Sequence, residues 1–347
     1  MSGTNLRFIN TLILSLLLVL TLTGVYGLFS PFPPSLFEIH RIAAWALILL
    51  IPWKTIISLR SLGRGVDRRL DRNVMLIVSI VASIATIIVI IFGLIWKWNL
   101  GEKYIWIANY GYTAIGWHWG IALYLLLPLF VIHAWRRWPH PKKIDFTGRR
   151  QILKLLGLGV ASIATWGAAE IIARSIQSSE SSRRFTGSRE EGSFAGNVHP
   201  VTSGPNQGKI KLDPSTWELR LTGAVLMPLT LSYADLVALS NSEVTAILDC
   251  TGGWYTTQTW RGVRLTDLFT HAGLQEHAAA VVLKGVAEYV ANFTLAQAQE
   301  ILLATHVGNE VLEHNHGYPL RAVVPSRRGW HWVKWLTEIE VVTISSL

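Results

Sequence analysis

Five apolar stretches in the first half of the chain constrain its fold more than any other feature. They run over residues 8–29, 37–57, 73–96, 115–135 and 152–174. Each is long enough to cross a bilayer as a helix, which takes about 20 apolar residues. Half of all 347 residues are hydrophobic and 15% are charged. This composition is too apolar for an ordinary soluble chain and too polar for a pure membrane bundle. We therefore expect an all-α transmembrane bundle followed by a second, mixed domain.

The positive charges indicate which ends of these spans face the cytoplasm. They cluster in two short loops, after the second and after the fourth span: Lys54, Arg60, Arg64, Arg68, Arg69 and Arg72, then Arg136, Arg137, Lys142, Lys143, Arg149 and Arg150. Positive loops stay in the cytoplasm. The N-terminus is therefore expected inside a bacterial-type cytoplasmic membrane, and everything after the fifth span on the outer (periplasmic or extracellular) side. The clustering also marks the net charge of +9 as a topology signal and not a nucleic-acid footprint.

The fifth span begins with a motif that resembles an export signal. Arg149 and Arg150 precede Ile152, Leu153 and Lys154, as in the twin-arginine signal; ordinary positive charge beside a span is the alternative. Such a signal is an address read by a receptor and not itself an anchor. The resemblance implies the twin-arginine export machinery as a partner. Because that pathway moves proteins that are already folded, it also implies a cofactor in the domain that follows. We expect the segment to remain uncleaved, as a tether.

Composition also sets the expected domain boundaries. Residues 1–140 are expected to form a membrane domain, 141–175 the twin-arginine transmembrane segment, 176–196 a flexible Ser-, Arg- and Glu-rich linker, and 197–347 a compact α+β domain. Alternating apolar runs in the last domain predict strands and short helices. The strands are expected near 217–223, 244–249, 280–286, 320–325 and 338–344, and the helices over 231–239, 265–273 and 294–300.

Two histidines within the spans are candidate haem ligands. Ionisable residues inside a membrane are rare and mark functional sites. His40 and His118 each lie about one helical turn into an inward-running span, so both sit near the outer face. Two facing imidazoles in a helical bundle can hold a b-type haem. The strings Phe37–Trp45 and Gly116–Trp119 resemble a small membrane cytochrome b of the b561 type. Arg41 would then pair with a haem propionate, or else extend to the interface.

A third histidine, His133, leaves the number of haems open. It follows His118 by 15 residues, roughly 22 Å along a helix, which is the spacing of two stacked haems. The second span offers no histidine near its inner end, around Lys54, so Met75 of the third span would be the other ligand. The competing interpretation places His133 at the inner interface beside Trp135. In a further alternative the bundle is only an anchor and binds no haem.

Cys250 is the only cysteine of the chain, which excludes several kinds of chemistry. A single cysteine has no partner for an intramolecular disulfide. It also cannot support an iron–sulfur cluster or a c-type haem, each of which needs more than one cysteine. Cys250 is therefore either a small buried hydrophobe or one specific thiolate.

Five segments of the last domain resemble, in their order and spacing, the sulfite oxidase family of molybdopterin enzymes. They are Trp217–Gly223, Asp249–Cys250 with its glycine-rich turn, Trp260–Phe269, His316–Pro325 and Val333–Leu336. The resemblance covers roughly residues 197–345 and implies a sulfite oxidase-like α+β fold that binds Mo-molybdopterin. It is nearest to the branch of the periplasmic methionine sulfoxide reductase catalytic subunit.

The resemblance implies roles for particular residues. Cys250 would be the catalytic thiolate that binds molybdenum. Arg321 and Lys334 suit the phosphate of the pterin by charge, a surface ion pair being the alternative. The residues implied to contact the cofactor are Asn197, His199, His316, Arg321, Trp332, Val333 and Lys334. His316 stands where the reductase branch carries an asparagine. Arg327 and Arg328 would make the substrate mouth cationic, or else form a solvated turn.

Together these features predict a membrane-bound molybdenum oxidoreductase. Haem b would exchange electrons with the membrane quinone pool, and oxygen-atom transfer to or from a small or protein-bound substrate would occur at molybdenum. Reduction of an S-oxide or N-oxide is the expected reaction, and sulfite oxidation with electrons delivered to quinone is the main alternative. The other alternative is a non-catalytic binding or electron-relay module. The additional dimerisation domain of animal and plant sulfite oxidases is not expected here.

Overall fold

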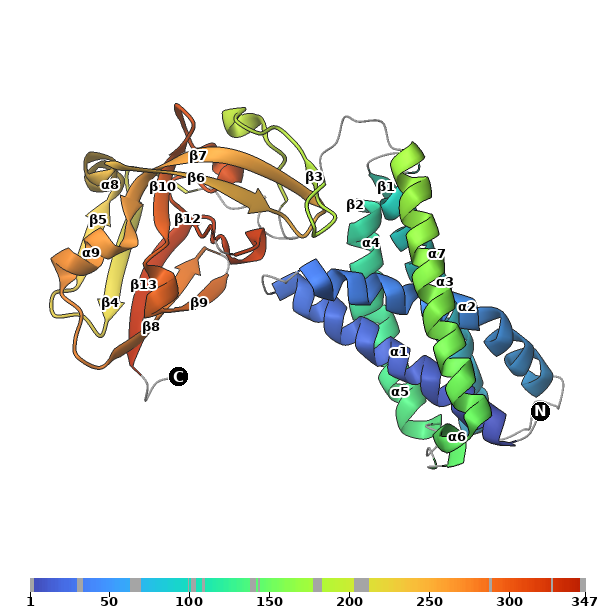
Figure 1. The fold of residues 1–347 in the computed structure, drawn as a ribbon. Coiled ribbons are helices and arrows are strands. Elements are labelled where there is room, and N and C mark those ends of the chain that lie inside the picture. Colours follow the sequence, from blue (N-terminus) through green and yellow to red (C-terminus); the bar gives the residue numbers. More distant parts are fainter. Residues whose placement is uncertain are drawn as a thin grey trace. The chain divides into compact units, whose positions relative to one another are not determined.

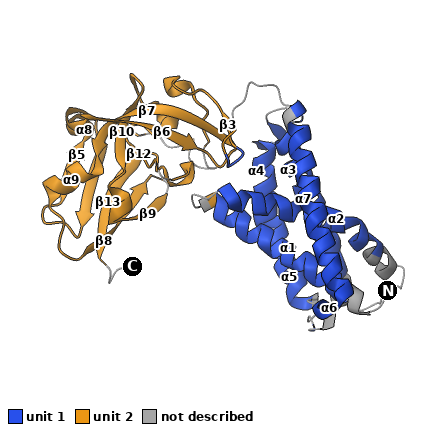
Figure 2. Cartoon of the chain, in the orientation of Figure 1, with its two compact units in different colours: residues 1–27, 32–181, 185–187 blue, residues 28–31, 182–184, 188–347 orange. Residues whose placement is uncertain are grey.

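The protein divides into two compact units (Figure 2). The N-terminal unit comprises residues 1–27, 32–181 and 185–187, and the C-terminal unit comprises residues 28–31, 182–184 and 188–347. The computed structural model describes residues 3–29, 34–62, 70–98, 100, 104–107, 110–137, 142, 144–176, 183–202, 212–286, 289–325 and 327–343.

The N-terminal unit is a bundle of long helices (Figure 1). Their bounds are α1 Gly3–Phe29, α2 Pro34–Leu62, α3 Leu70–Trp98, α4 Ala114–Ile121, α5 Leu127–Arg137, α6 Ile144–Thr147 and α7 Arg149–Ile176. A π-helical turn, η1 (Ala122–Leu126), joins α4 to α5 without a break. Within the described ranges, five helical stretches are long and apolar enough to cross a membrane, and they coincide with the five expected spans. The helices extend past those spans because their polar ends continue the same backbone hydrogen bonding.

Helix α7, which was expected to form a separate twin-arginine segment, belongs to this bundle and is not a separate unit. Helix α7 packs mainly against α2, and its small residues Ala169 and Ala173 are buried. Lys97 at the end of α3 forms an ion pair with Glu170 of α7. The expected boundary at residue 140 therefore divides helices that the structure joins.

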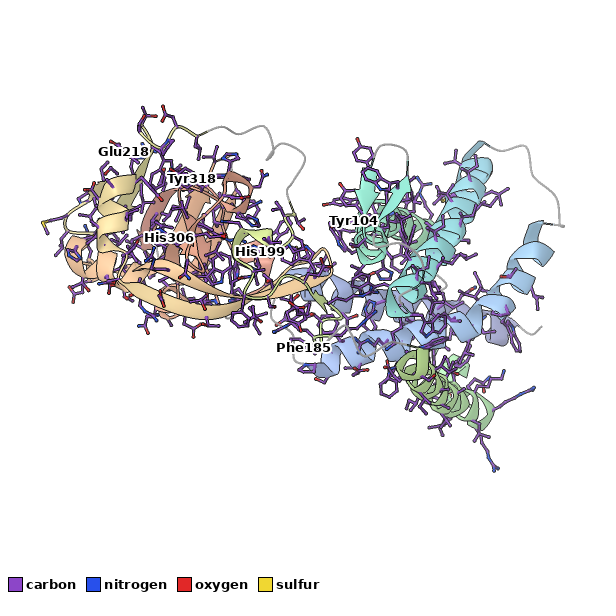
Figure 3. All side chains as sticks on the ribbon, turned by 90° about the horizontal axis from the view of Figure 1, so that it is seen from above. Tyr104, Phe185, His199, Glu218, His306 and Tyr318 are labelled. Carbon is purple, nitrogen blue, oxygen red and sulfur yellow. The ribbon has the colours of Figure 1, made fainter. Side chains whose placement is uncertain are left out.

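A short hairpin that the sequence did not predict connects α3 to α4. Its strands are β1 (Ile105–Ile107) and β2 (Tyr110–Tyr112), and Tyr104 precedes it (Figure 3). The indole N–H of Trp117 donates to the carbonyl of the first residue of β1 at 2.8 Å. Thr113 caps α4, because its side chain accepts the backbone N–H of Gly116 at 3.1 Å. The hairpin and the cap together fix the start of the helix that carries His118.

The described part of the C-terminal unit contains two sheets with short helices, which confirms the predicted α+β class. One sheet has the order β11-β10-β7-β3, with β12 also paired to β10 and β6 also paired to β7. The other has the order β5-β4-β13-β8-β9. The strands are β3 Arg189–Glu190, β4 Glu218–Gly223, β5 Leu229–Ser232, β6 Ser242–Asp249, β7 Trp254–Arg264, β8 Ala278–Gly285, β9 Val290–Thr294, β10 Leu302–Val307, β11 Glu310–Val311, β12 Arg321–Val323 and β13 Leu336–Thr343. The α-helices are α8 Tyr233–Leu239, α9 Leu265–Ala272 and α10 Leu295–Ala298, and the 3₁₀ turns include η2 Gly196–Val198, η4 His314–His316 and η5 Gly329–His331.

Each of the five predicted strands and three predicted helices overlaps an element of the structure. The long strand β7 was missed because its inward positions include the buried polar residues Thr256 and Gln258, which conceal the alternation of apolar side chains. Strand β7 also approaches β10 closely at Gly262, where a Cβ atom would lie 1.9 Å from the carbonyl oxygen of Leu303. Only glycine permits that approach.

The prediction of a flexible linker over residues 176–196 was wrong for its second half. Helix α7 ends at Ile176, and residues 177–182 lie outside the described ranges. Strand β3 then pairs in parallel with β7, and the backbone N–H of Phe194 donates to the carbonyl of Thr257 at 2.8 Å. The segment has few apolar side chains, which predicted a linker, but its backbone hydrogen bonds to β7 do not depend on side chains.

Candidate functional site

Cys250 lies in the tight connection between β6 and β7. Strand β6 ends at Asp249, and the backbone N–H of Cys250 donates to the carbonyl of Trp254 at 2.8 Å. The side chain is 8% exposed. Its thiol donates to Thr202 Oγ1 at 3.3 Å, and the backbone N–H of Gly252 donates to the sulfur at 3.4 Å. Burial raises the pKa of the Cys250 thiol, while these two hydrogen bonds oppose the rise.

A buried carboxylate holds this connection in place. Asp249 accepts the hydroxyl of Ser188 at 2.7 Å, Arg184 Nε at 3.1 Å and Arg328 Nη2 at 3.2 Å. Arg328 Nη2 also donates to the carbonyl of Cys250 at 3.0 Å. The expectation that Arg328 lines a cationic substrate mouth or a solvated turn is therefore corrected, because its charge pairs with Asp249 and its side chain fixes the backbone of Cys250.

Arg321 is a buried cation in the same region. It is 5% exposed, and its Nη1 donates to the carbonyl of His316 at 2.8 Å. Its guanidinium lies over the rings of Trp260 and Trp332, 5.4 and 5.7 Å from their centroids. Arg321 Nε is buried and has no hydrogen-bond partner among the described residues. Burial lowers the pKa of Arg321 to about 10, with the nearby acidic groups of Cys250 and Tyr289 opposing that change.

Lys334 lies next to Arg321 and Cys250. Its Nζ donates to the carbonyls of Thr202 at 3.2 Å and Asn315 at 3.1 Å, and lies 4.5 Å from the centroid of the Trp335 ring. Burial, followed by repulsion from Arg321, lowers the pKa of Lys334 to about 7. The structure thus brings together Arg321 and Lys334, the two cations that were predicted to bind a phosphate. The alternative of a surface ion pair is wrong for Arg321, because that side chain is buried.

His199 and His316 form a pair of neutral imidazoles, with ring centroids 4.0 Å apart. His199 lies in the C-terminal unit, as Figure 3 shows. Burial is the main cause that lowers their pKa values, to about 3 for His199 and about 4 for His316. His316 Nε2 lies 2.8 Å from the carbonyl oxygen of Asn197, and His199 Nδ1 lies 2.7 Å from that of Gly196. A carbonyl only accepts hydrogen bonds, so both of these nitrogens carry the hydrogen. His199 Nε2 is then a buried acceptor, and no described residue donates to it.

The other predicted cofactor contacts serve the protein's own structure. The side chain of Asn197 donates to Glu310 and to the carbonyl of Val311 at 3.1 and 2.9 Å. Trp332 is buried, and its indole N–H donates to the carbonyl of Arg327 at 3.0 Å. Val333 is buried, and its carbonyl accepts the N–H of Ala322. Asn197 therefore acts through its backbone, which orients His316.

Tyr289 is a site residue that the sequence did not single out. Its hydroxyl donates to the carbonyl of Trp330. Burial raises the pKa of Tyr289; the charge of Arg321 opposes this shift and that of Cys250 adds to it. A lone tyrosine outside any motif gave no signal, because only the fold brings Tyr289, just before β9, close to Cys250 and Arg321.

In the N-terminal unit the structure brings His40 and His118 together. Their ring centroids are 6.3 Å apart, with an angle of 69° between the planes. His40 Nδ1 lies 2.8 Å from Thr23 Oγ1 of α1, and His118 Nδ1 lies 2.8 Å from the carbonyl of Val89 of α3. Each ring is thus held through Nδ1, and Nε2 is the ring nitrogen that these contacts leave open. Arg41 forms an ion pair with Glu38 at 2.5 Å.

His133 lies apart from this pair. Its Nδ1 is 3.0 Å from Ser79 Oγ of α3, and the serine hydroxyl is also within 2.6 Å of the carbonyl of Met75. Because a hydroxyl has one hydrogen to donate, donation to Met75 leaves Ser79 to accept from His133. This contact of His133 is with a serine of α3.

Comparisons with known proteins find similarity over the C-terminal unit. Residues 206–346 match the family described as oxidoreductase molybdopterin binding domain. The chain is 34% identical over 131 residues to the uncharacterized oxidoreductase YuiH of Bacillus subtilis, a match that covers 37% of this chain and 66% of that protein. It is 35% identical over 162 residues to mitochondrial sulfite oxidase of Rattus norvegicus, covering 38% and 30% respectively. The chain thus spans less than two thirds of each relative. The crystal structure of the sulfane dehydrogenase SoxCD from Paracoccus pantotrophus aligns with 38% of this chain and 40% of its own, at 25% identity and a TM-score of 0.37.

We expect the substitution Asp249→Asn to destabilise the C-terminal unit. Asparagine keeps the shape but leaves the charges of Arg184 and Arg328 without their carboxylate. Because Arg184 is partly exposed, the free energy of unfolding should fall by about 2–3 kcal/mol. This is at or below the lower end of the range for breaking a buried ion pair. Thermal unfolding of the full-length protein in detergent would show a lower Tm. The matched control is Glu276→Gln, at an exposed carboxylate; equal Tm values for the two variants would contradict the role of Asp249.

Proposed function

We propose that the C-terminal unit is a molybdopterin-binding domain of the sulfite oxidase family, and that the protein is a membrane-bound molybdenum oxidoreductase. The observation that carries the proposal is the composition of the site. A buried thiol, a buried cation with an unpartnered donor and a buried imidazole acceptor lie together at Cys250, Arg321 and His199. These groups are costly to bury, and each suits a different part of one anionic, metal-bearing cofactor.

The residues present fit Mo-molybdopterin. Cys250 would supply the thiolate to molybdenum, Arg321 and Lys334 would bind the phosphate, and His199 Nε2 would accept a hydrogen bond from the pterin. When bound, the metal supplies oxygen-atom transfer. The protein must first release the proton of the thiol, which burial retains at neutral pH; ligation of a metal displaces such a proton. The unpartnered Arg321 Nε supports this assignment.

The bundle supports a b-type haem between His40 and His118. His40 and His118 would hold the haem iron through the Nε2 atoms that their Nδ1 contacts leave open. Their ring centroids are 6.3 Å apart. When bound, haem supplies one-electron transfer. We propose that it links the membrane quinone pool to the molybdenum site.

The membrane orientation follows from the loop charges. We propose that five helices span a bacterial-type cytoplasmic membrane with the N-terminus inside and the C-terminal unit outside. The twin-arginine export machinery would translocate the C-terminal unit after its cofactor is inserted. The ion pair of Lys97 with Glu170 supports retention of α7 as an uncleaved tether.

The proposed reaction is reduction of an S-oxide or N-oxide. Arg328 pairs with Asp249, so one of the two arginines of this turn has its charge compensated, and this favours a neutral substrate over an oxyanion. Sulfite oxidation with electrons passed to quinone is the second candidate, favoured by the similarity to rat sulfite oxidase. A non-catalytic module is disfavoured, because such a module would not need a thiol beside the two cations.

The substitution Cys250→Ser is expected to abolish turnover. Serine is a poor ligand for a soft metal site and keeps the size of the side chain. Wild type and variant should be compared for molybdenum content. They should also be assayed for reduction of methionine sulfoxide, dimethyl sulfoxide and trimethylamine N-oxide with reduced viologen, and for sulfite oxidation with ferricyanide. Molybdenum-loaded wild type that turns over none of these substrates would overturn the proposed reaction.

Haem content tests the electron route. Alanine at His40 or at His118 removes one of two ligands, so each variant should lose most of its haem in a pyridine haemochrome assay. His133→Ala is the control and should retain it. If all three variants bind as much haem as wild type, the assignment of the ligands is wrong.

Uptake of metal-free molybdopterin, which does not displace the thiol proton of Cys250, is expected to weaken as the pH rises through about 7. Burial and the charge of Arg321 lower the pKa of Lys334 to about 7. It is therefore charged below that pH and neutral above it, and phosphate binding must restore the proton. The affinity should fall by up to about tenfold per pH unit above the pKa. In Lys334→Arg the charge persists, so the same measurement should show a flatter profile; parallel profiles would contradict this role.

A further inference from the structure

Thr202 contacts the thiol from a different part of the chain. It follows the turn η2 and lies outside the β6–β7 connection, yet its hydroxyl oxygen is 3.3 Å from Cys250 Sγ. Cys250 is held on its other side by its own loop, through the backbone N–H of Gly252 at 3.4 Å. We propose that Thr202 is a positioning residue that donates a hydrogen bond to the metal-bound thiolate and thereby raises the reduction potential of the molybdenum centre. This inference rests on the proposed function.

The direction of the hydrogen bond follows from a neighbouring indole. Trp254 Nε1 donates to Thr202 Oγ1 at 3.1 Å. An indole N–H is only a donor, and a hydroxyl has two acceptor positions and one hydrogen. In the free protein the hydroxyl therefore accepts from both Trp254 and the thiol. Once the thiol proton is lost, Trp254 still occupies one acceptor position, and the hydrogen of Thr202 can turn to the sulfur.

The backbone of Thr202 joins this contact to the cofactor-binding cation. The carbonyl of Thr202 accepts a hydrogen bond from Lys334 Nζ at 3.2 Å. One residue therefore contacts the proposed metal ligand through its side chain and the proposed phosphate-binding residue through its backbone. A side-chain substitution at position 202 leaves the second contact possible, so the two roles can be separated.

A hydrogen bond to a metal-bound thiolate withdraws electron density from the sulfur. The thiolate then donates less charge to the metal, which favours the reduced state of the metal. Loss of the hydrogen bond should shift the potential in the negative direction. Valine has the shape of threonine without the hydroxyl, so Thr202→Val removes the donor and leaves the volume unchanged.

The test is a redox titration of the molybdenum centre in the full-length protein, with the absorption band from sulfur to molybdenum as a second readout. Thr202→Val should have a more negative midpoint potential and a band at lower energy. Thr202→Ser, which restores the hydroxyl, should match wild type. The matched control is Thr251→Val, the same chemical change in the next position after Cys250, where no bond to the sulfur occurs; it should also match wild type.

Unchanged potential and band in Thr202→Val would overturn the inference, as would an equal shift in Thr251→Val. If Thr202→Val does not fold, Thr202→Ala removes the same hydroxyl in a smaller side chain; a shift in potential and band supports the inference, and none overturns it. Wild type without molybdenum would overturn the proposed function and this inference together, whereas loaded protein with coincident potentials overturns this inference alone.

Discussion

The C-terminal unit depends on a positive charge buried beside its only thiol. Arg321 is enclosed by the rings of Trp260 and Trp332, and the described residues place no carboxylate against it. Burying an unpaired ion costs several kcal/mol, and its pKa of about 10, below the ordinary 12.5, reflects that cost. A fold can retain such a buried charge when an anionic ligand compensates it. The two neutral imidazoles and Lys334 lie near Arg321 and belong to the same proposed cofactor site.

The thiol itself is fixed by groups from distant parts of the chain. Arg184 and Ser188, which follow the last helix of the bundle, bind Asp249, and Arg328 binds both Asp249 and the carbonyl of Cys250. Thr202 contacts the sulfur itself. The segment once expected to be a flexible linker therefore takes part in positioning the site. In the bundle, side chains are likewise positioned by groups from other segments, since His40 and His118 are each oriented through Nδ1 by a neighbouring helix.

The sequence predicted the elements whose pattern is local. The apolar runs located the five long helices, and the alternation of apolar residues located five strands of the C-terminal unit, including β6 before Cys250. It could not reveal β7, whose buried face carries Thr256 and Gln258, or the pairing of β3, which rests on backbone hydrogen bonds. Motifs pointed to Cys250, Arg321 and Lys334. Tyr289 and Thr202 belong to no motif, and only the three-dimensional arrangement brings them to the site.

X-ray absorption at the molybdenum edge tests most directly whether the sulfur of Cys250 binds molybdenum. Wild-type protein should show the two sulfur neighbours of the pterin dithiolene plus one from the protein, and Cys250→Ser should lose one sulfur neighbour while retaining the other two. An identical number of sulfur neighbours in wild type and variant would contradict the account.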